Sequence, residues 1–280
     1  MPFVPLHDQN PRVLIGRPWV TWGLILGSSL VYLYEALAAP DELQRLVLGL
    51  GAIPAVLTGE LRIPDEFYLV PPVFTLISYQ FLHGEPLHLI FNMAYLWVFG
   101  DNIEDAMGHR RFLAFFLLCG VLAALAHLAA DPSSRSPIIG ASGAISGTLG
   151  AYLVLHPKAR VLVPVILFIP FYLPAYLLLV VWIGFQVYAV ALIPGGADDG
   201  VAWWAHIGGF VAGMALIPLF RHKAIPLWRA YDLPTGLELT VRDHSPRRRE
   251  PSRDRQPSRQ TQEDASGKRR PKAHRRGPWG

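Results

Sequence analysis

The sequence predicts an all-α membrane protein with six transmembrane helices, both termini in the cytoplasm and a disordered basic tail. Of its 280 residues, 52% are hydrophobic and 16% are charged, whereas soluble domains carry roughly 25% charged residues. Six apolar stretches are long enough for a bilayer span, which needs about 20 residues. Lysine and arginine are concentrated in alternate loops, and residues 242–280 contain almost nothing that could be buried.

The six stretches are residues 18–39, 82–100, 112–130, 138–155, 161–193 and 201–220. In the fifth stretch, prolines at 164, 170 and 174 confine the regular helix to the part from about Leu173, because proline removes a helix hydrogen bond. Residues 40–80 are amphipathic and interrupted by prolines. We therefore expect them to form an external loop with short interfacial helices.

Positive charge marks the loops that we expect on the cytoplasmic side. Lysine or arginine residues lie before the first span, between the second and third, between the fourth and fifth, and after the sixth. The other loops are acidic or nearly neutral. We therefore expect a cytoplasmic N-terminus (residues 1–17), a six-span domain (residues 18–220) and a cytoplasmic tail (residues 221–280).

The C-terminal tail carries sixteen of the 25 Lys and Arg residues, so the pI of about 9.3 is a property of the tail. We expect it to contact the anionic headgroups of the lipid bilayer. Nucleic-acid binding is disfavoured, since no aromatic stacking platform accompanies the charges. The single cysteine, Cys119, excludes a disulfide framework and a thiolate metal site. Residues 1–17 lack the pattern of a removable signal peptide.

Polar residues at a similar depth in the even-numbered spans indicate acyl-transfer chemistry. His88 and Asn92 are spaced i, i+4 near the start of the second span, Ser142 begins the fourth, and His206 lies a few residues into the sixth. Polar groups inside a membrane are costly, so each is a functional hypothesis. A serine nucleophile needs an adjacent base, most often histidine. The Ser142 backbone N–H, Asn92 and His88 are candidate donors to the oxyanion of a tetrahedral intermediate.

Small residues beside these positions allow the helices to approach each other closely. The glycines that we expect to pack at the site are Gly140, Gly143, Gly147, Gly209 and Gly213. Packing the helix face that carries Ser142 against the face that carries His206 would bring the hydroxyl within reach of the imidazole.

Each of these residues also has a structural interpretation. Ser142 could be a small packing residue, His206 an interfacial histidine, and the polar pair of the second span an interhelical hydrogen bond. Ser146 is interpreted as packing. The motif around Ser142 is not the hydrolase elbow G-x-S-x-G, because Ala144 replaces the last glycine. The shared depth of the polar groups is what favours chemistry.

Three blocks resemble the rhomboid intramembrane serine proteases. They are His-Leu-Ile-Phe-Asn at residues 88–92, Gly-Ala-Ser-Gly at 140–143 and Ala-His-Ile-Gly-Gly-Phe-Val-Ala-Gly at 205–213, and they occur in the family's order. Residues 99–108 also resemble the family's segment that closes the second helix. The resemblance extends from about Val73 to Leu219. It implies a six-helix bundle around a water-filled cavity that opens outward.

The resemblance also implies a Ser–His dyad, with Ser142 as the nucleophile and His206 as the general base. The oxyanion hole would consist of the Ser142 backbone N–H, His88 and Asn92. Substrates would be membrane proteins cleaved in or near a transmembrane segment, with no metal or cofactor. Some members carry an aromatic residue one turn after the nucleophile, where this chain has Ser146. The orientation of His206 must then come from elsewhere.

We therefore expect an intramembrane serine endopeptidase in a cell membrane, with the bacterial inner membrane as its location and an active site that opens to the extracytoplasmic side. The competing hypothesis is a catalytically silent relative that binds transmembrane segments, although such relatives usually lack one of the two reacting residues. A transporter or channel has less support, because the polar groups lie at one surface and not along a path.

Overall fold

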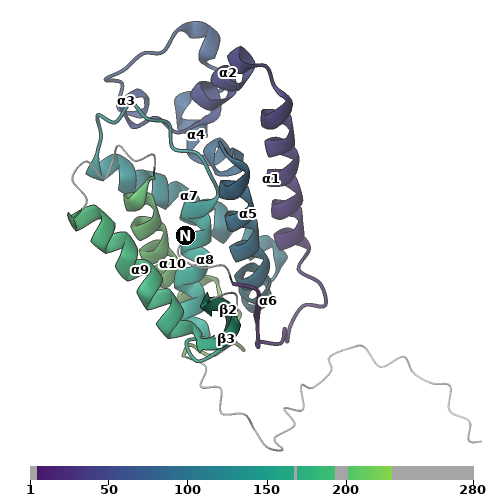
Figure 1. Ribbon diagram of the computed structural model, residues 1–280. Helices are drawn as coiled ribbons and strands as arrows, with labels where there is room; N and C mark the ends of the chain where they lie inside the picture. The colour runs from purple at the N-terminus through teal and green to yellow at the C-terminus, as the bar shows by residue number, and fades with distance from the viewer. Residues whose placement is uncertain (1–4, 167–168, 193–200, 229–280) are drawn as a thin grey trace, which may run out of the picture. The chain divides into compact units, whose positions relative to one another are not determined.

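The protein forms a bundle of helices, shown by a computed structural model that describes residues 5–166, 169–192 and 201–228 (Figure 1). A π-helical turn, η4 (Leu96–Gly100), joins α5 to α6, so residues 86–107 are helical throughout. By length and composition, α1, α7, α9 and α10 are apolar enough to cross a membrane. The main helices are α1 (Trp19–Leu37), α5 (Pro86–Tyr95), α6 (Asp101–Met107), α7 (His109–Ala130), α8 (Ser142–Leu155), α9 (Ala175–Leu192) and α10 (Trp203–Phe220).

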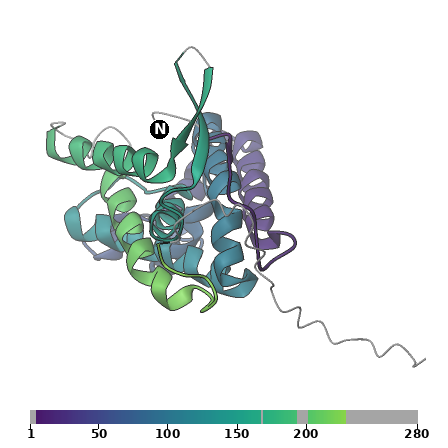
Figure 2. The same ribbon diagram turned by 90° about the horizontal axis from the view of Figure 1, so that it is seen from below.

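Helix α8 lies in the middle of the bundle, where it contacts α7, α9, α10 and the segment from α5 to α6 (Figure 2). All of its residues are buried except Ser142 and Leu153. It has 14 residues and begins at Ser142, four residues later than the span expected at residues 138–155. A helix of that length measures about 21 Å, which is less than the roughly 30 Å of a bilayer's hydrocarbon core. The burial of nearly all its residues shows that other helices surround α8 on its sides.

Backbone packs against backbone where α8 meets α10. A Cβ atom added to Gly209 would overlap the carbonyl group of Gly143, and one added to Gly213 would overlap the backbone of Gly147. On α7, Cys119 also lies too close to Gly147 for a Cβ atom there. Glycine is the residue that permits this separation. Gly143, Gly147, Gly209 and Gly213 therefore lie where α8 and α10 meet, whereas Gly140 lies against His88.

The segment between α1 and α5 forms a loop of short helices, as its prolines and amphipathic pattern predicted. It ends close to α8, because the Gly140 N–H donates to the carbonyl oxygen of Tyr79 at 2.9 Å. The elements of this loop are α2 (Pro40–Leu50), α3 (Pro54–Leu57), η1 (Asp65–Phe67), η2 (Pro72–Phe74), α4 (Thr75–Ser78) and η3 (Tyr79–Phe81).

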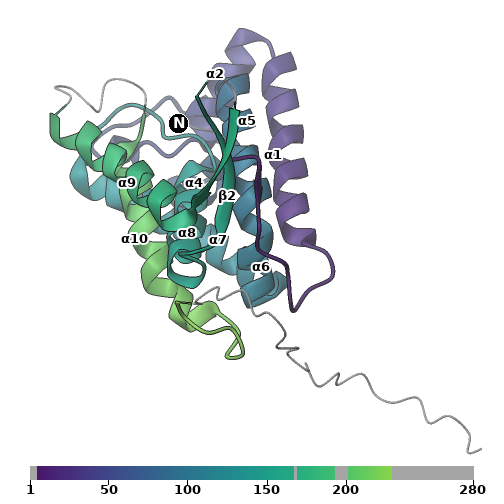
Figure 3. The same cartoon turned by 60° about the horizontal axis from the view of Figure 1, so that its bottom comes forward.

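An antiparallel hairpin that we did not predict lies between α8 and α9 (Figure 3). Its strands are β2 (Arg160–Ile166) and β3 (Ile169–Pro174), and a short N-terminal strand, β1 (His7–Asp8), pairs with β2. The prolines exclude a helix here, and α9 begins directly after Pro174, close to the predicted Leu173. The valine, isoleucine and aromatic residues of this run favour strands instead.

Residues 221–228 follow α10 and contact the bundle. The His222 N–H donates to the carbonyl oxygen of Ala106 at 2.6 Å, and the Trp228 N–H donates to that of Val154 at 3.0 Å. The tail from residue 229 onward lies outside the described residues, so its disorder and its lipid contact stay predictions. The six-span count and the cytoplasmic termini also stay predictions, because length and composition identify four candidate spans among the described residues.

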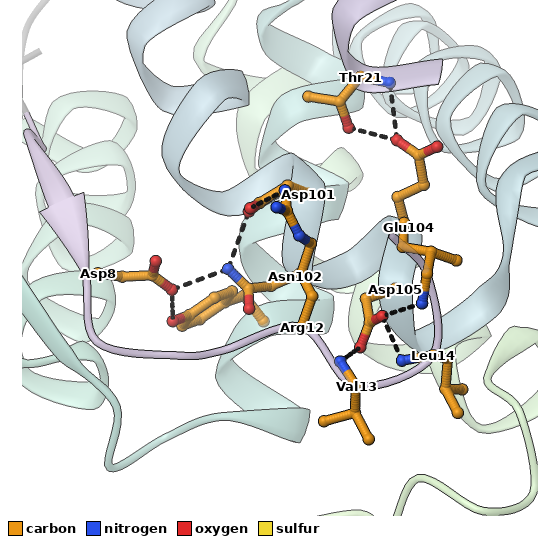
Figure 4. A network of polar contacts seen from close by, with 11 residues as sticks. Asp8, Arg12, Val13, Leu14, Thr21, Asp101, Asn102, Glu104 and Asp105 are labelled. Atoms are coloured by element: carbon orange, nitrogen blue, oxygen red, sulfur yellow. Dashed lines mark hydrogen bonds and ion pairs between the residues drawn. The ribbon is translucent and has the colours of Figure 1, made fainter. Parts of the chain in front are cut away.

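Glu104 of α6 holds the start of α1 (Figure 4). Its buried carboxylate accepts the N–H of Val20 at 3.0 Å, the N–H of Thr21 at 2.8 Å and the Thr21 hydroxyl at 2.7 Å. The first N–H groups of a helix have no acceptor within the helix, and a negative charge at that end is favourable. Glu104 therefore caps α1 from a different helix.

Two more carboxylates fasten the segment before α1 to the bundle (Figure 4). Asp105 accepts the N–H groups of residues 13–15 at 2.7–2.8 Å. Asp8 accepts from the Tyr152 hydroxyl and from Asn102 Nδ2. Burial raises the pKa of Asp8 to about 7, although the hydrogen bond from Tyr152 acts in the opposite direction. This segment therefore depends on a carboxyl group that titrates near neutral pH.

We expect the N-terminal segment to dock less tightly as the pH rises. A carboxyl with a raised folded-state pKa contributes stability that is fully present below its unfolded pKa, near 3.8, and is lost as the pH rises through about 7. Burial also raises the pKa of Asp101 to about 6, which acts in the same direction. After correction for intrinsic rates, the amides of residues 13–15 should exchange more slowly with deuterium at pH 5 than at pH 8. Asp8→Asn should reduce this difference, and a reversed difference would contradict the assignment.

Gly213→Ala should destabilise the fold by about 1–3 kcal/mol, because the new methyl group overlaps the backbone of α8. Thermal unfolding in detergent measures the effect. Gly27→Ala is the matched control in α1, since no atom lies within 4 Å of its Cβ position and alanine is the better helix former. Equal melting temperatures for the two variants would contradict the close contact between α8 and α10.

Candidate active site

Ser142 begins α8 just after an unusual backbone conformation at Gly140. The φ angle of Gly140 is +113°, in a region that strains residues with a side chain. A Cβ atom at Gly140 would also lie 2.6 Å from Cε1 of His88. Glycine is therefore needed here on two grounds. As the first residue of α8, Ser142 has an N–H group without an acceptor inside the helix.

The Ser142 hydroxyl and the His206 imidazole are hydrogen-bonded. Ser142 Oγ lies 2.8 Å from His206 Nε2, although 64 residues separate the two positions in the sequence. Ser142 is half-buried and His206 is buried. The glycine contacts between α8 and α10 bring the two helix faces to this distance. An imidazole nitrogen so placed can accept the proton of the serine hydroxyl.

A third residue, Gln186 of α9, which we did not predict, contacts the other nitrogen of the same ring. Gln186 Oε1 lies 2.8 Å from His206 Nδ1, and the side chain is 2% exposed. Gln186 is the only amide or charged side chain of α9. A polar residue inside an apolar span is by itself a functional signal. That signal could have identified it.

The aromatic neighbours of His206 come from α9 and α10. Its ring centroid lies 6.0 Å from that of Trp182 and 6.2 Å from that of Trp203. Ser146, which stands where some family members carry an aromatic residue, is buried and donates its hydroxyl to the Ser142 carbonyl oxygen at 2.6 Å. Ser146 therefore packs within α8, as its structural interpretation predicted.

His88 and Asn92 of α5 lie beside the loop that precedes Ser142. A Cβ atom at Gly140 would be 2.7 Å from His88 Nε2 and 3.6 Å from Asn92 Nδ2. Asn92 is 1% exposed, and neither atom of its amide group has a hydrogen-bond partner among the described residues. Buried polar groups are nearly always paired. An unpaired amide donor beside the loop that precedes Ser142 could therefore donate to an oxygen atom of a substrate.

The arrangement has the parts of a serine nucleophile site. A hydroxyl, a base and spare hydrogen-bond donors come from α8, α10 and α5 respectively. The imidazole can take the hydroxyl proton, and the donors can stabilise negative charge on a carbonyl oxygen. Within the described ranges, no group of three or more His, Cys, Asp or Glu side chains is placed to hold a metal ion.

A family model described as the rhomboid domain matches residues 71–223, the range that contains all of these residues. The chain is 32% identical to RHOMBOID-like protein 5 of Arabidopsis thaliana over 239 residues, which cover 75% of this chain and 70% of the relative. It is 30% identical to the mitochondrial presenilin-associated rhomboid-like protein A of Danio rerio over 144 residues, 46% of this chain and 38% of the relative.

A shorter match joins the chain to the rhomboid protease GluP of Bacillus subtilis. The two are 39% identical over 79 residues, which cover 28% of this chain and 15% of that protein. The chain therefore spans less than half the length of the zebrafish and Bacillus relatives.

Proposed function

The chain belongs to the rhomboid family, and from this premise we propose that it is a serine endopeptidase that cleaves membrane proteins in or near their transmembrane segments. The observation that carries the proposal is the 2.8 Å hydrogen bond between Ser142 Oγ and His206 Nε2. The printed name of the Bacillus relative, a rhomboid protease, adds support. No cofactor takes part in the proposed reaction.

In the proposed mechanism, Ser142 Oγ attacks the carbonyl carbon of the scissile peptide bond while His206 Nε2 takes the hydroxyl proton. The negative charge that forms on the carbonyl oxygen is stabilised by the Ser142 backbone N–H, His88 and Asn92. His206 then gives its proton to the leaving amine, and the carbon–nitrogen bond breaks. A water molecule, deprotonated by His206, hydrolyses the acyl-enzyme and regenerates Ser142.

The alternative is a catalytically silent rhomboid-like protein that binds transmembrane segments without cutting them. The paired hydroxyl and imidazole argue against it, because a pure binding protein has no need of a serine that shares its proton with a base. A serine-directed fluorophosphonate probe separates the two readings, since it labels only an activated serine.

We also propose the topology that the charge pattern predicts. The domain at residues 18–220 would cross the membrane six times, with both termini in the cytoplasm and the active site open to the opposite side. The four span-length helices support a multi-pass membrane protein. For its location, the bacterial inner membrane competes with a mitochondrial membrane, because several relatives, the zebrafish protein among them, are mitochondrial by name.

Ser142→Ala and His206→Ala should each abolish cleavage of a single-span substrate in detergent, with losses of at least about 10²-fold. Ser142→Ala should also abolish fluorophosphonate labelling, because the labelled oxygen is gone. Ser136→Ala, an exposed serine in the preceding loop, is the matched control and should cleave like the wild type. Cleavage that survives in Ser142→Ala would refute the proposed function.

Asn92→Leu should lower the activity of the protein without lowering its stability. Loss of one oxyanion donor should lower kcat about 10²–10³-fold with little change in KM. The melting temperature should hold or rise, because the amide that is removed is buried and unpaired. Asn102→Leu is the matched control: that buried amide is paired with Asp8, so its loss should lower the melting temperature and spare kcat. A wild-type kcat in Asn92→Leu would show that Asn92 does not stabilise the oxyanion.

A further inference from the structure

The hydrogen bond at His206 Nδ1 has a direction that the structure fixes. Gln186 Nε2 donates to the backbone carbonyl oxygen of Trp182 at 3.3 Å. A carbonyl oxygen can only accept, so the NH₂ group of the amide must face Trp182. The amide oxygen is then the atom that faces His206, at 2.8 Å.

This direction determines which ring nitrogen carries the proton. The Gln186 oxygen can only accept a hydrogen bond, so Nδ1 of His206 must be the N–H donor. A neutral imidazole has a single N–H group, and its other nitrogen then holds a lone pair. Nε2 is therefore free to accept from Ser142 Oγ. In the opposite tautomer, Nε2 would donate to the hydroxyl and could not take its proton.

We propose that Gln186 is a positioning residue that holds His206 in the tautomer with the proton on Nδ1. This inference rests on the proposed function, because the tautomer matters only if His206 acts as a base. Gln186 does not touch the substrate or the Ser142 hydroxyl. It acts on the reaction only by orienting His206. It supplies the orientation that an aromatic residue at position 146 would otherwise give. It also extends the Ser–His pair to a third helix, α9.

The placement of Gln186 supports this role over simple packing. Burial of an amide group in an apolar helix is costly unless its atoms are hydrogen-bonded. Gln186 lies on the face of α9 that is buried against the bundle, together with Leu178, Leu179 and Trp182, where an aliphatic residue would pack without that cost. Both of its polar atoms are used, one within α9 and one on the imidazole. A glutamine at such a position, with its oxygen on the imidazole, indicates a need for that oxygen.

The test compares two substitutions at residue 186 with a matched control elsewhere. Gln186→Leu keeps the approximate size and removes the acceptor. Gln186→Glu keeps an acceptor and adds a negative charge beside the ring. Gln80→Leu makes the same chemical change at another buried glutamine, which also donates to the carbonyl oxygen four residues earlier. Fluorophosphonate labelling and cleavage rates are measured against pH, together with melting temperatures and ¹⁵N NMR spectra of histidine-labelled protein.

Gln186→Leu should lower kcat at least about tenfold with KM little changed, since a wrong tautomer removes the base and leaves the binding surface intact. In the ¹⁵N spectrum, the His206 signals should show a mixture of the two tautomers and no longer the Nδ1–H form alone. Gln186→Glu should restore labelling relative to Gln186→Leu and move the acid limb of the pH profile to higher pH, because a carboxylate favours the imidazolium. Gln80→Leu should change only the melting temperature.

Wild-type kcat, tautomer and pH profile in Gln186→Leu would overturn the inference. If Gln186→Leu fails to fold, Gln186→Glu provides the test. An acid limb of its pH profile at the wild-type pH would overturn the inference. Inactive Ser142→Ala beside fully active Gln186→Leu would leave the proposed function standing and remove only the role of Gln186. Active Ser142→Ala would remove both.

Discussion

Glycines at positions 143, 147, 209 and 213 let the backbones of α8 and α10 touch, and the distance between Ser142 and His206 follows from that contact. Lipid tails are as apolar as leucine, so helices in a bilayer gain little from burying apolar side chains against each other. Close backbone packing is therefore a main source of attraction between them, beside hydrogen bonds between helices. The same contact that holds the bundle together thus sets the separation of the proposed nucleophile and its base.

The polar groups at two places in this protein differ in how they are paired. Those that join α6 to α1 and to the N-terminal segment are fully used: Glu104 and Asp105 together accept three backbone N–H groups of the segment and two of α1, plus the Thr21 hydroxyl. At the site, Asn92 keeps both amide atoms without a partner in the described part of the chain. The groups at the first place stabilise the fold, and Asn92 at the second resembles a group reserved for a ligand.

The helices were predictable from the sequence, and most of the candidate site was proposed from it, because each left a local trace. Apolar length marked the spans, prolines marked the start of α9, and glycine spacing marked the faces of α8 and α10. The hairpin of β2 and β3 was not predicted, since proline excludes a helix without indicating a strand partner. Gln186 was not predicted because polar residues were compared only among the even-numbered spans. Its contact with His206 depends on how α9 packs, which no local pattern records.

A neutral third residue suits a site enclosed by apolar helices. An aspartate or glutamate in the place of Gln186 would hold the same tautomer and would also favour the imidazolium. Its charge, however, would have to be desolvated on the buried face of α9, at a cost of several kcal/mol. The amide oxygen of Gln186 gives the orientation without that cost, and its NH₂ group is satisfied within its own helix. Orientation of the base and burial of the site are therefore compatible in this protein because the orienting group carries no charge.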